Sequence, residues 1–325
     1  MAMLQATPEW QTAVCGYEAR ADWPPVTVLM AVHRGAAHLP EQLDSLTDQQ
    51  HKNWSLVASI DGEDDGSGDI LEAHPSAARI TRIAGPGRGA AANFLHLMRE
   101  VEPGSYWAFS DQDDFWLPHK LGRAVERLED MPWNTPAMYH SRSLVTDVGL
   151  DNHRLSAARP RPPSFANALV QNIAGGNTIV LNPAASRLVH AASHDVEDVV
   201  VHDWWLYQLI TGAGGTVIHD DAPSLLYRQH GDNLIGANDG MRARASRLRM
   251  VLDGTYKTWM EVNLAALQAC AKHFTPENRS LLRRLVIARH QPLAVRMKML
   301  RNVGIHRQTQ FASSVMWLSV ILGRL

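Results

Sequence analysis

Short apolar runs alternate with amphipathic segments over the first third of the chain. Continuous apolar runs are typical of strands buried in a parallel sheet. Between them, apolar side chains recur at helical spacing, as Leu39, Leu43 and Leu46 do after the first run. This alternation predicts right-handed βαβ units and a mainly parallel sheet. The runs occupy residues 26–32, 54–60, 79–84 and 106–109.

The rest of the chain changes character twice. Its middle carries further short apolar runs, and the pattern becomes wholly helical from about residue 241. We therefore expect a lead-in over residues 1–25, an α/β domain over 26–240 and a helical region over 241–325. Further strands are predicted at 138–145, 178–181, 216–218 and 225–227, and a helix at 204–210.

Charge divides the chain at the same place. The net charge is −2, but residues 1–240 hold 16 Lys and Arg against 30 Asp and Glu, a net charge of −14. Residues 241–325 hold 15 Lys and Arg against 3 Asp and Glu, a net charge of +12. This split predicts an anionic partner for the helical region, either nucleic acid or an anionic membrane surface.

Cysteine use and the N-terminus bear on the compartment. Cys15 and Cys270 form no disulfide-like or metal-like pattern, which favours a reducing compartment. The N-terminus carries Glu9 and Glu18 and no apolar signal core, so we expect no secretion signal. No segment reaches the roughly 18–20 apolar residues of a membrane-spanning helix.

The predicted strand Tyr106–Phe109 leads into three carboxylates, Asp111, Asp113 and Asp114. Carboxylates this close repel one another, and a bound divalent cation relieves the repulsion. Mg²⁺ and Mn²⁺ prefer oxygen ligands, usually one or two carboxylates together with substrate phosphates. An acidic surface turn is the alternative. The buried strand before the cluster and the aromatic pair after it favour a metal–diphosphate site.

Three more polar clusters follow predicted strands: His33-Arg34, Asp61–Asp69 and Gly85–Gly89. Each taken alone is also typical of an ordinary turn. The carboxyl ends of parallel strands meet at one edge of a sheet, so together with the acidic cluster they predict a crevice for a nucleotide diphosphate. The third cluster carries Arg88 and opens a helix whose N-terminal amides suit phosphate.

A fifth cluster, His202-Asp203-Trp204-Trp205, begins a predicted helix. One interpretation is a general base, Asp203, beside an aromatic platform for a sugar, because partial burial raises a carboxylate's pKa towards a useful value. The alternative is that Asp203 caps the helix and the tryptophans belong to the core. Further on, His230 is either a metal ligand or a structural histidine.

The order and spacing of these clusters resemble the family 2 inverting glycosyltransferases, which have the GT-A fold. The resemblance is closest to the bacterial rhamnosyltransferase-like subgroup of polysaccharide and O-antigen synthesis. It runs from about Val26 to Asn233 and implies a Rossmann-like, mixed but mainly parallel sheet flanked by helices. It rests on Ser110–Trp116, Asp64–Ser67, Gly89 with Asn93-Phe94, Gln171-Asn172 with Gly176, His202–Trp205 and Tyr227–His230.

The resemblance implies a role for each matching residue. Asp111 would contact the ribose or the metal, Asp113 would ligate Mg²⁺ or Mn²⁺, and Asp203 would take the proton from the acceptor hydroxyl. Either Asp61 or Asp65 would contact the base or ribose, because extra residues before Asp64 obscure the match. The remaining contacts would be His33, Arg34, Arg88 and Asn93 to the nucleotide, His230 to the metal, and Trp116, His202, Trp204 and Trp205 to the acceptor.

Besides the extra residues before Asp64, the chain departs from the family pattern at two positions. His33-Arg34 stands where the family usually has Tyr-Asn, and His202 precedes the expected base where Glu is frequent. The Gln-x-x-Arg-Trp motif of processive synthases does not occur in the sequence. The absence of this motif predicts the addition of one sugar per event.

The resemblance also suggests partners. We expect a dTDP- or UDP-sugar donor, with rhamnose as the subgroup's sugar, and a glycan or lipid-linked saccharide acceptor. Such acceptors predict a cytoplasmic enzyme, with residues 241–325 held peripherally at the inner face of the cytoplasmic membrane. The alternative is that these helices pack on the catalytic domain or on a second subunit of a homo-oligomer.

Two other functions compete with this interpretation, a different nucleotide-dependent transferase and a non-catalytic carbohydrate-binding relative. Asp113 and Asp203 together favour catalysis, because a protein that only binds sugar needs no base. Nucleic-acid binding is not expected, since the helical region shows no recognition motif.

Overall fold

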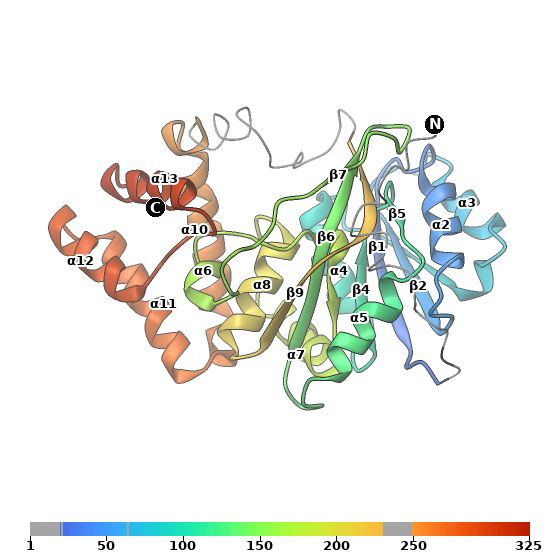
Figure 1. The fold of residues 1–325 in the computed structure, drawn as a ribbon, viewed down its shortest axis with the longest axis horizontal. Helices are drawn as coiled ribbons and strands as arrows, with labels where there is room; N and C mark the ends of the chain where they lie inside the picture. Colours follow the sequence, from blue (N-terminus) through green and yellow to red (C-terminus); the bar gives the residue numbers. More distant parts are fainter. Residues whose placement is uncertain (1–19, 21, 64, 230–248) are drawn as a thin grey trace, which may run out of the picture.

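A mixed nine-stranded sheet lies at the centre of the protein in the computed structural model, which describes residues 20, 22–63, 65–229 and 249–325 (Figure 1). Its first half is parallel, as the alternating pattern predicts. These strands are, in spatial order, β3 (Ile80–Ala84), β2 (Trp54–Ile60), β1 (Val26–Val32) and β4 (Tyr106–Ser110).

The second half of the sheet mixes directions. β8 pairs antiparallel with β4 and with β6, β6 and β9 are parallel, and β5 is antiparallel to β9. A short strand, β7, pairs with β6 outside the main order. These strands are β5 (Phe115–Trp116), β6 (Ala137–Thr146), β7 (Arg154–Leu155), β8 (Val180–Leu181) and β9 (Thr216–Arg228). The predicted mixed, mainly parallel sheet is confirmed.

The prediction of two short strands at 216–218 and 225–227 is wrong, because β9 is continuous across both. The Asp-Asp-Ala-Pro sequence between them has the composition of a turn. In the structure Ser141 pairs with Asp220 and Arg142 pairs with Pro223, so Asp221 and Ala222 are extra residues opposite β6. A bulge takes up these residues without ending the strand.

Helices cover both faces of the sheet and make a three-layer arrangement. One face packs against α2 (Leu39–Thr47), α3 (Ser67–Ala73) and α5 (Lys120–Glu129). The other packs against α4 (Ala90–Glu100), α7 (Pro183–Ser193) and α8 (His202–Gly212). Short helical turns are η1 (Ala77–Arg79), α6 (Phe165–Ala168), η2 (Gly176–Thr178) and η3 (Ala271–His273).

The predicted C-terminal helices are present beyond α8, at one end of the molecule (Figure 1). Met260, Leu264 and Phe274 belong to the same hydrophobic cluster as Leu206 and Leu209 of α8, so these helices pack on the α/β layers. None of the described helices is long and apolar enough to cross a membrane. They are α10 (Thr255–Ala269), α11 (Pro276–Arg289), α12 (Leu293–Val303) and α13 (Gln310–Ile321).

Candidate functional site

The polar clusters that follow the first four strands meet at one edge of the sheet. The register places Val32 opposite Ile60, Ile60 opposite Ala84, and Met30 opposite Ser110. All four strands run in the same direction, so the loops after them emerge side by side, where open α/β sheets bind their ligands.

Side-chain hydrogen bonds tie these loops together. The Gln112 amide accepts from the His33 N–H at 2.6 Å and donates to the His33 carbonyl at 2.8 Å, joining the loops after β1 and β4. The Asp65 carboxylate accepts from the Ala36 N–H at 3.1 Å and from the Ser67 hydroxyl at 2.5 Å, joining the loops after β1 and β2. Burial by itself would raise the pKa of Asp65, but the hydrogen bonds from Ser67 and Ala36 outweigh burial and lower that pKa.

Asp61 shapes the Gly85–Gly89 turn. Its two carboxylate oxygens accept hydrogen bonds from the N–H groups of Gly87 at 2.6 Å and Gly89 at 2.7 Å, and the residue is 3% exposed. Both glycines have positive φ angles, 68° and 85°, which residues other than glycine rarely adopt. Asp61 thus holds the turn's backbone, whereas Asp65 is exposed to solvent.

The acidic cluster after β4 carries repelling carboxylates. Burial, followed by repulsion from Asp113 and Asp203, raises the pKa of Asp111 to about 7. Burial together with repulsion from Asp111 and Asp113 raises the pKa of Asp114 well above its ordinary value. Two hydrogen bonds from η2 place the start of α8 beside the end of β4, because Gly176 donates to Asp203 and Asn177 donates to Asp114.

Lys120 is a member of this site that sequence reasoning missed. Its ammonium donates to the Asn177 carbonyl at 2.7 Å and lies over the Trp116 ring at 4.3 Å. The Asn177 amide donates in turn to Asp114 at 2.6 Å. Burial lowers the pKa of Lys120 to about 7 against the attraction of Asp114 and Asp111. The sequence signal for this residue is a lysine near the start of an amphipathic helix, six residues after Asp114.

Asp203 occupies the first turn of α8. The N-cap of this helix is Val201, so the alternative that Asp203 is the cap residue is wrong. Its carboxylate accepts from the Trp204 N–H at 2.7 Å and the Gly176 N–H at 3.1 Å. Burial raises the pKa of Asp203 to about 6, although these bonds and one from the Asn172 side chain oppose the rise. A carboxylate with such a pKa takes and releases protons near neutral pH.

The expected aromatic platform is wrong. The side chains of Trp116, Trp204 and Trp205 are buried in the hydrophobic core and present no ring face to a sugar. Trp204 also donates its indole N–H to the Ala168 carbonyl at 2.7 Å. Nearly all of α8 after Asp203 is buried, which explains why its aromatic residues belong to the core.

His202 is likewise a packing residue, so its expected contact to the acceptor is wrong. Its ring is 8% exposed and stacks on Phe94, with ring centroids 3.7 Å apart. Burial lowers the pKa of His202 to about 3, so the ring is neutral at physiological pH.

The expected contact between Asn93 and the nucleotide is wrong. It is buried, and its amide exchanges hydrogen bonds with Ser59, donating to the carbonyl at 2.9 Å and accepting from the hydroxyl at 2.5 Å, which fastens α4 to β2. His33, Arg34 and Arg88 are exposed at the loop edge. Arg88 pairs with Asp198 at 2.7 Å on the surface.

Two predicted positions, Asp64 and His230, lie outside the described residues. The described residues contain no group of three or more His, Cys, Asp or Glu side chains arranged to hold a metal ion. Of the three residues predicted to bind the metal, the structure therefore describes two, Asp111 and Asp113.

A buried arginine stabilises the loop that carries this pair. Arg228, at the end of β9, donates to the Asp113 carbonyl at 2.9 Å. Its guanidinium also donates to the Val148 carbonyl and forms an ion pair with Glu41 of α2. The arginine of the Tyr227–His230 motif is therefore a structural support for the acidic loop.

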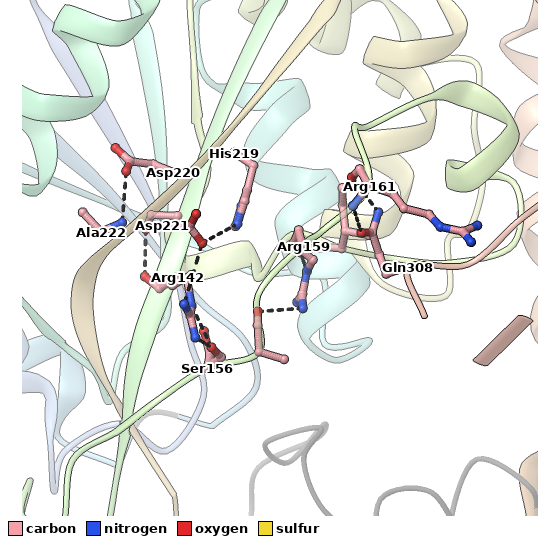
Figure 2. Close-up of polar contacts among 12 residues, drawn as sticks. Arg142, Ser156, Arg159, Arg161, His219, Asp220, Asp221, Ala222 and Gln308 are labelled. Carbon is pink, nitrogen blue, oxygen red and sulfur yellow. Dashed lines mark hydrogen bonds and ion pairs between the residues drawn. The ribbon is translucent and has the colours of Figure 1, made fainter. Parts of the chain in front are cut away.

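The loop before α13 supports the site from the other side. The Gln308 amide accepts from the Arg161 N–H at 2.9 Å and donates to the Arg161 carbonyl at 3.1 Å (Figure 2). The Gln308 N–H donates to the Gln171 side chain at 2.7 Å. Gln171 precedes Asn172, which hydrogen-bonds Asp203, so the C-terminal region contacts the segment that holds the candidate base.

The chain is similar to known glycosyltransferases. Residues 27–173 match the family described as "Glycosyl transferase family 2". The dTDP-rhamnosyl transferase RfbG of Shigella flexneri is 27% identical over 238 residues, which cover 70% of this chain and 81% of that protein. The putative teichuronic acid biosynthesis glycosyltransferase TuaG of Bacillus subtilis is 26% identical over 163 residues, covering 50% and 64%.

A solved structure shares the fold. The crystal structure of S. aureus TarS 1-349 in complex with UDP-GlcNAc has a TM-score of 0.54 and 10% identity, covering 92% of this chain and 90% of that one. The likeness confirms the predicted fold class.

Proposed function

We propose that this chain, whose residues 27–173 match the family 2 glycosyl transferases, moves one sugar from a nucleotide diphosphate donor to a glycan or lipid-linked acceptor, with inversion at the anomeric carbon. The setting is the synthesis of a bacterial cell-surface polysaccharide such as O-antigen. The similarity to a protein named dTDP-rhamnosyl transferase supports rhamnose as the sugar and dTDP as the nucleotide.

The nucleotide binds along the loops at the carboxyl ends of β1, β2 and β4. Asp65 contacts the base or ribose, since it is exposed whereas Asp61 is buried and holds the Gly85–Gly89 turn. His33 and Arg34 line the same edge. Arg88 exchanges its surface ion pair with Asp198 for the anionic donor, because a diphosphate carries more charge than one carboxylate.

The pair Asp111 and Asp113 fits a divalent cation. Burial and then repulsion from Asp113 raise the pKa of Asp111, and a bound cation would remove the repulsion. Two carboxylates suffice, because Mg²⁺ or Mn²⁺ takes further ligands from substrate phosphates and water. When bound, the ion supplies positive charge to the departing nucleotide diphosphate.

The position of Asp203 is the observation that supports this function most strongly. It lies beside the acidic cluster, since η2 contacts Asp203 through Gly176 and Asp114 through Asn177, and its pKa of about 6 suits a general base. The hydrogen bonds from Gly176, Trp204 and Asn172 fix its carboxylate without neutralising it. Asp203 therefore accepts the proton from the acceptor hydroxyl as that oxygen attacks.

Inversion follows from a single displacement. The acceptor oxygen forms a bond to the anomeric carbon while the bond from that carbon to the diphosphate oxygen breaks on the opposite face. The leaving oxygen takes the bonding electrons, and the proton of the attacking hydroxyl passes to Asp203. One such step inverts the configuration of the anomeric carbon.

The expected acceptor determines where in the cell the enzyme works. Lipid-linked saccharides lie at the inner face of the cytoplasmic membrane, so the enzyme works in the cytoplasm against that surface. Buried Trp116, Trp204 and Trp205 leave the recognition of the acceptor to other residues.

A donor screen tests the proposal. The protein with Mn²⁺ is mixed with dTDP-rhamnose or a UDP-sugar, and both thermal unfolding and transfer to a rhamnose-terminated oligosaccharide are measured. We expect one nucleotide sugar to raise the unfolding temperature and to yield a product of inverted configuration by NMR. Absence of both stabilisation and transfer with every donor would contradict the proposal, and a product of retained configuration would contradict the single displacement.

A further inference from the structure

The last helix, α13, has an unusual composition for a helix at the protein surface. Its residues, Gln310–Ile321, include no charged side chain. One side packs into the core through Val315, Met316 and Val320. A helix on the outside of a water-soluble domain normally carries charged or polar side chains opposite its buried side.

The opposite side of α13 is apolar as well. Phe311 is 46% exposed, Leu318 36%, Ile321 50%, and Leu322, the C-cap residue, 46%. The spacing of Phe311, Leu318 and Ile321 is that of one helix face, and we call these four side chains the α13 face. Four of the ten exposed large hydrophobic side chains of the described residues thus lie on α13 or at its C-cap. Exposed apolar side chains gathered on one helix face are typical of a binding surface.

The start of α12 extends this surface. Arg296 donates to the Val320 carbonyl at 2.9 Å, which ties the first turns of α12 to the last turn of α13. Leu293 and Val295, each 45% exposed, lie in those first turns. The exposed apolar area is therefore contributed by two helices.

Positive charge borders the same surface. Lys298 and Arg301 of α12 are exposed, and the Arg301 guanidinium lies over the Trp317 ring of α13 at 6.0 Å. Residues 241–325 as a whole carry 15 Lys and Arg against 3 Asp and Glu. An apolar face edged by basic side chains is complementary to a surface with anionic groups above hydrocarbon.

We propose that the α13 face binds an anionic phospholipid surface, with Phe311, Leu318, Ile321 and Leu322 in the acyl boundary and Lys298 and Arg301 at the headgroups. At 1.5 Å per residue, the twelve residues of α13 measure about 18 Å, well short of the hydrocarbon core of about 30 Å, so the helix lies in the interface. A second copy of the chain is disfavoured as the occupant, because it would bring two strongly basic regions together.

Vesicle flotation tests the proposal without any sugar nucleotide, so its outcome is separate from that of the proposed reaction. The full chain is mixed at low salt with phosphatidylcholine vesicles, alone or blended with phosphatidylglycerol. We expect flotation with the blend and none with phosphatidylcholine alone. A face variant, Phe311→Ser/Leu318→Ser/Ile321→Ser, and a charge variant, Lys298→Glu/Arg301→Glu, should each lose about tenfold or more of the bound fraction.

Matched controls separate the α13 face from exposed side chains in general. Trp133→Ser removes the most exposed apolar side chain of the α/β part, and Arg187→Glu reverses an exposed charge there. Both should float like the unaltered chain. The face variant should still unfold in one cooperative transition, at a lower temperature because the replaced side chains are half-buried, and should keep its transfer rate with a soluble acceptor.

Three results would overturn the proposal. The first is an unaltered chain that does not float with anionic vesicles, and the second is a face variant that floats as well as the unaltered chain. The third is a chain that light scattering shows to be a dimer without binding vesicles, and that the face variant turns into a monomer. That last result would assign the α13 face to a subunit interface.

Discussion

The Gly176 N–H donates to the Asp203 carboxylate at 3.1 Å and thereby joins η2 to the first turn of α8. The space around Gly176 is limited. A Cβ at this position would lie 2.5 Å from His202 Nε2 and 3.4 Å from Asp203 Cβ. His202 cannot move away easily, since its ring is stacked on Phe94. Glycine at this position is therefore needed for the position of the candidate base.

Replacing Gly176 with alanine should displace Asp203. We expect Gly176→Ala to reduce stability by about 1–3 kcal/mol, because the added methyl overpacks a buried site. The transfer rate should fall while the affinity for the nucleotide sugar changes little. Urea unfolding and transfer kinetics measure both effects. Gly149→Ala is the control, since its Cβ would meet atoms at 3.6 Å, an ordinary contact.

Removing the Asp111 carboxylate should stabilise the protein at alkaline pH. The folded-state pKa of about 7 lies above the ordinary value of 3.8, so the associated stability is complete below about pH 4 and is lost as the pH rises through 7. We expect Asp111→Asn to raise the unfolding free energy at pH 8 by about 1–2 kcal/mol, after allowing for partial exposure to solvent.

The gain from Asp111→Asn should shrink as the pH falls from 8 to 5, measured by urea unfolding without divalent ions. Asp130→Asn at an exposed position is the control and should show no such trend. Mn²⁺ together with the donor should stabilise the unaltered chain and leave Asp111→Asn unchanged. An equal gain at every pH would contradict the electrostatic explanation.

Lys120 and Asp114 should depend on each other. Lys120→Met leaves a buried carboxylate without its nearby cation, and we expect a loss of about 3 kcal/mol in the free energy of unfolding. Asp114→Asn should also destabilise the protein, since Lys120 then lacks its counter-charge. The double variant should lose less than the sum, by about 1 kcal/mol or more. Strict additivity in this cycle would show that the two charges do not interact.

Gln308 should link the C-terminal region to the site. Gln308→Ala leaves the Arg161 N–H and carbonyl without their partner, at a cost of about 1–3 kcal/mol in unfolding free energy. It should also lower the transfer rate, because loss of these side-chain bonds loosens the loop whose Gln308 N–H donates to Gln171, next to the Asn172 that hydrogen-bonds Asp203. Gln310→Ala, at an exposed position, should change neither quantity. A Gln308 variant with unaltered stability would refute this link.

The sequence predicts the strands well where apolar runs are continuous. The predicted bounds 26–32 and 54–60 coincide with β1 and β2, since both strands are largely buried and end in polar turns. The break predicted inside β9 fails because Asp220–Pro223 has the composition of a turn, and the pairing partner that absorbs the bulge is distant in sequence.

The candidate site was predictable in part. The strand ends and the carboxylates follow from local pattern and topology. Whether an aromatic side chain faces the core or a ligand does not, and Trp204 and Trp205 lie on a helix that is buried nearly all round. Lys120 and Gln308 were not predicted as parts of the site. Their partners, Asn177 and Arg161, lie far away in the sequence, and only the fold brings them together.

Transfer by Asp203→Asn tests the central claim, that Asp203 takes the proton from the acceptor. With saturating donor and Mn²⁺, the variant should bind the nucleotide sugar normally but turn over roughly 10²–10⁴-fold more slowly. The unaltered chain should lose activity as the pH falls below about 6, where Asp203 becomes protonated, and the variant should lose this dependence. Asp130→Asn, at the exposed C-cap of α5, should behave like the unaltered chain. A near-normal rate with Asp203→Asn would contradict the account.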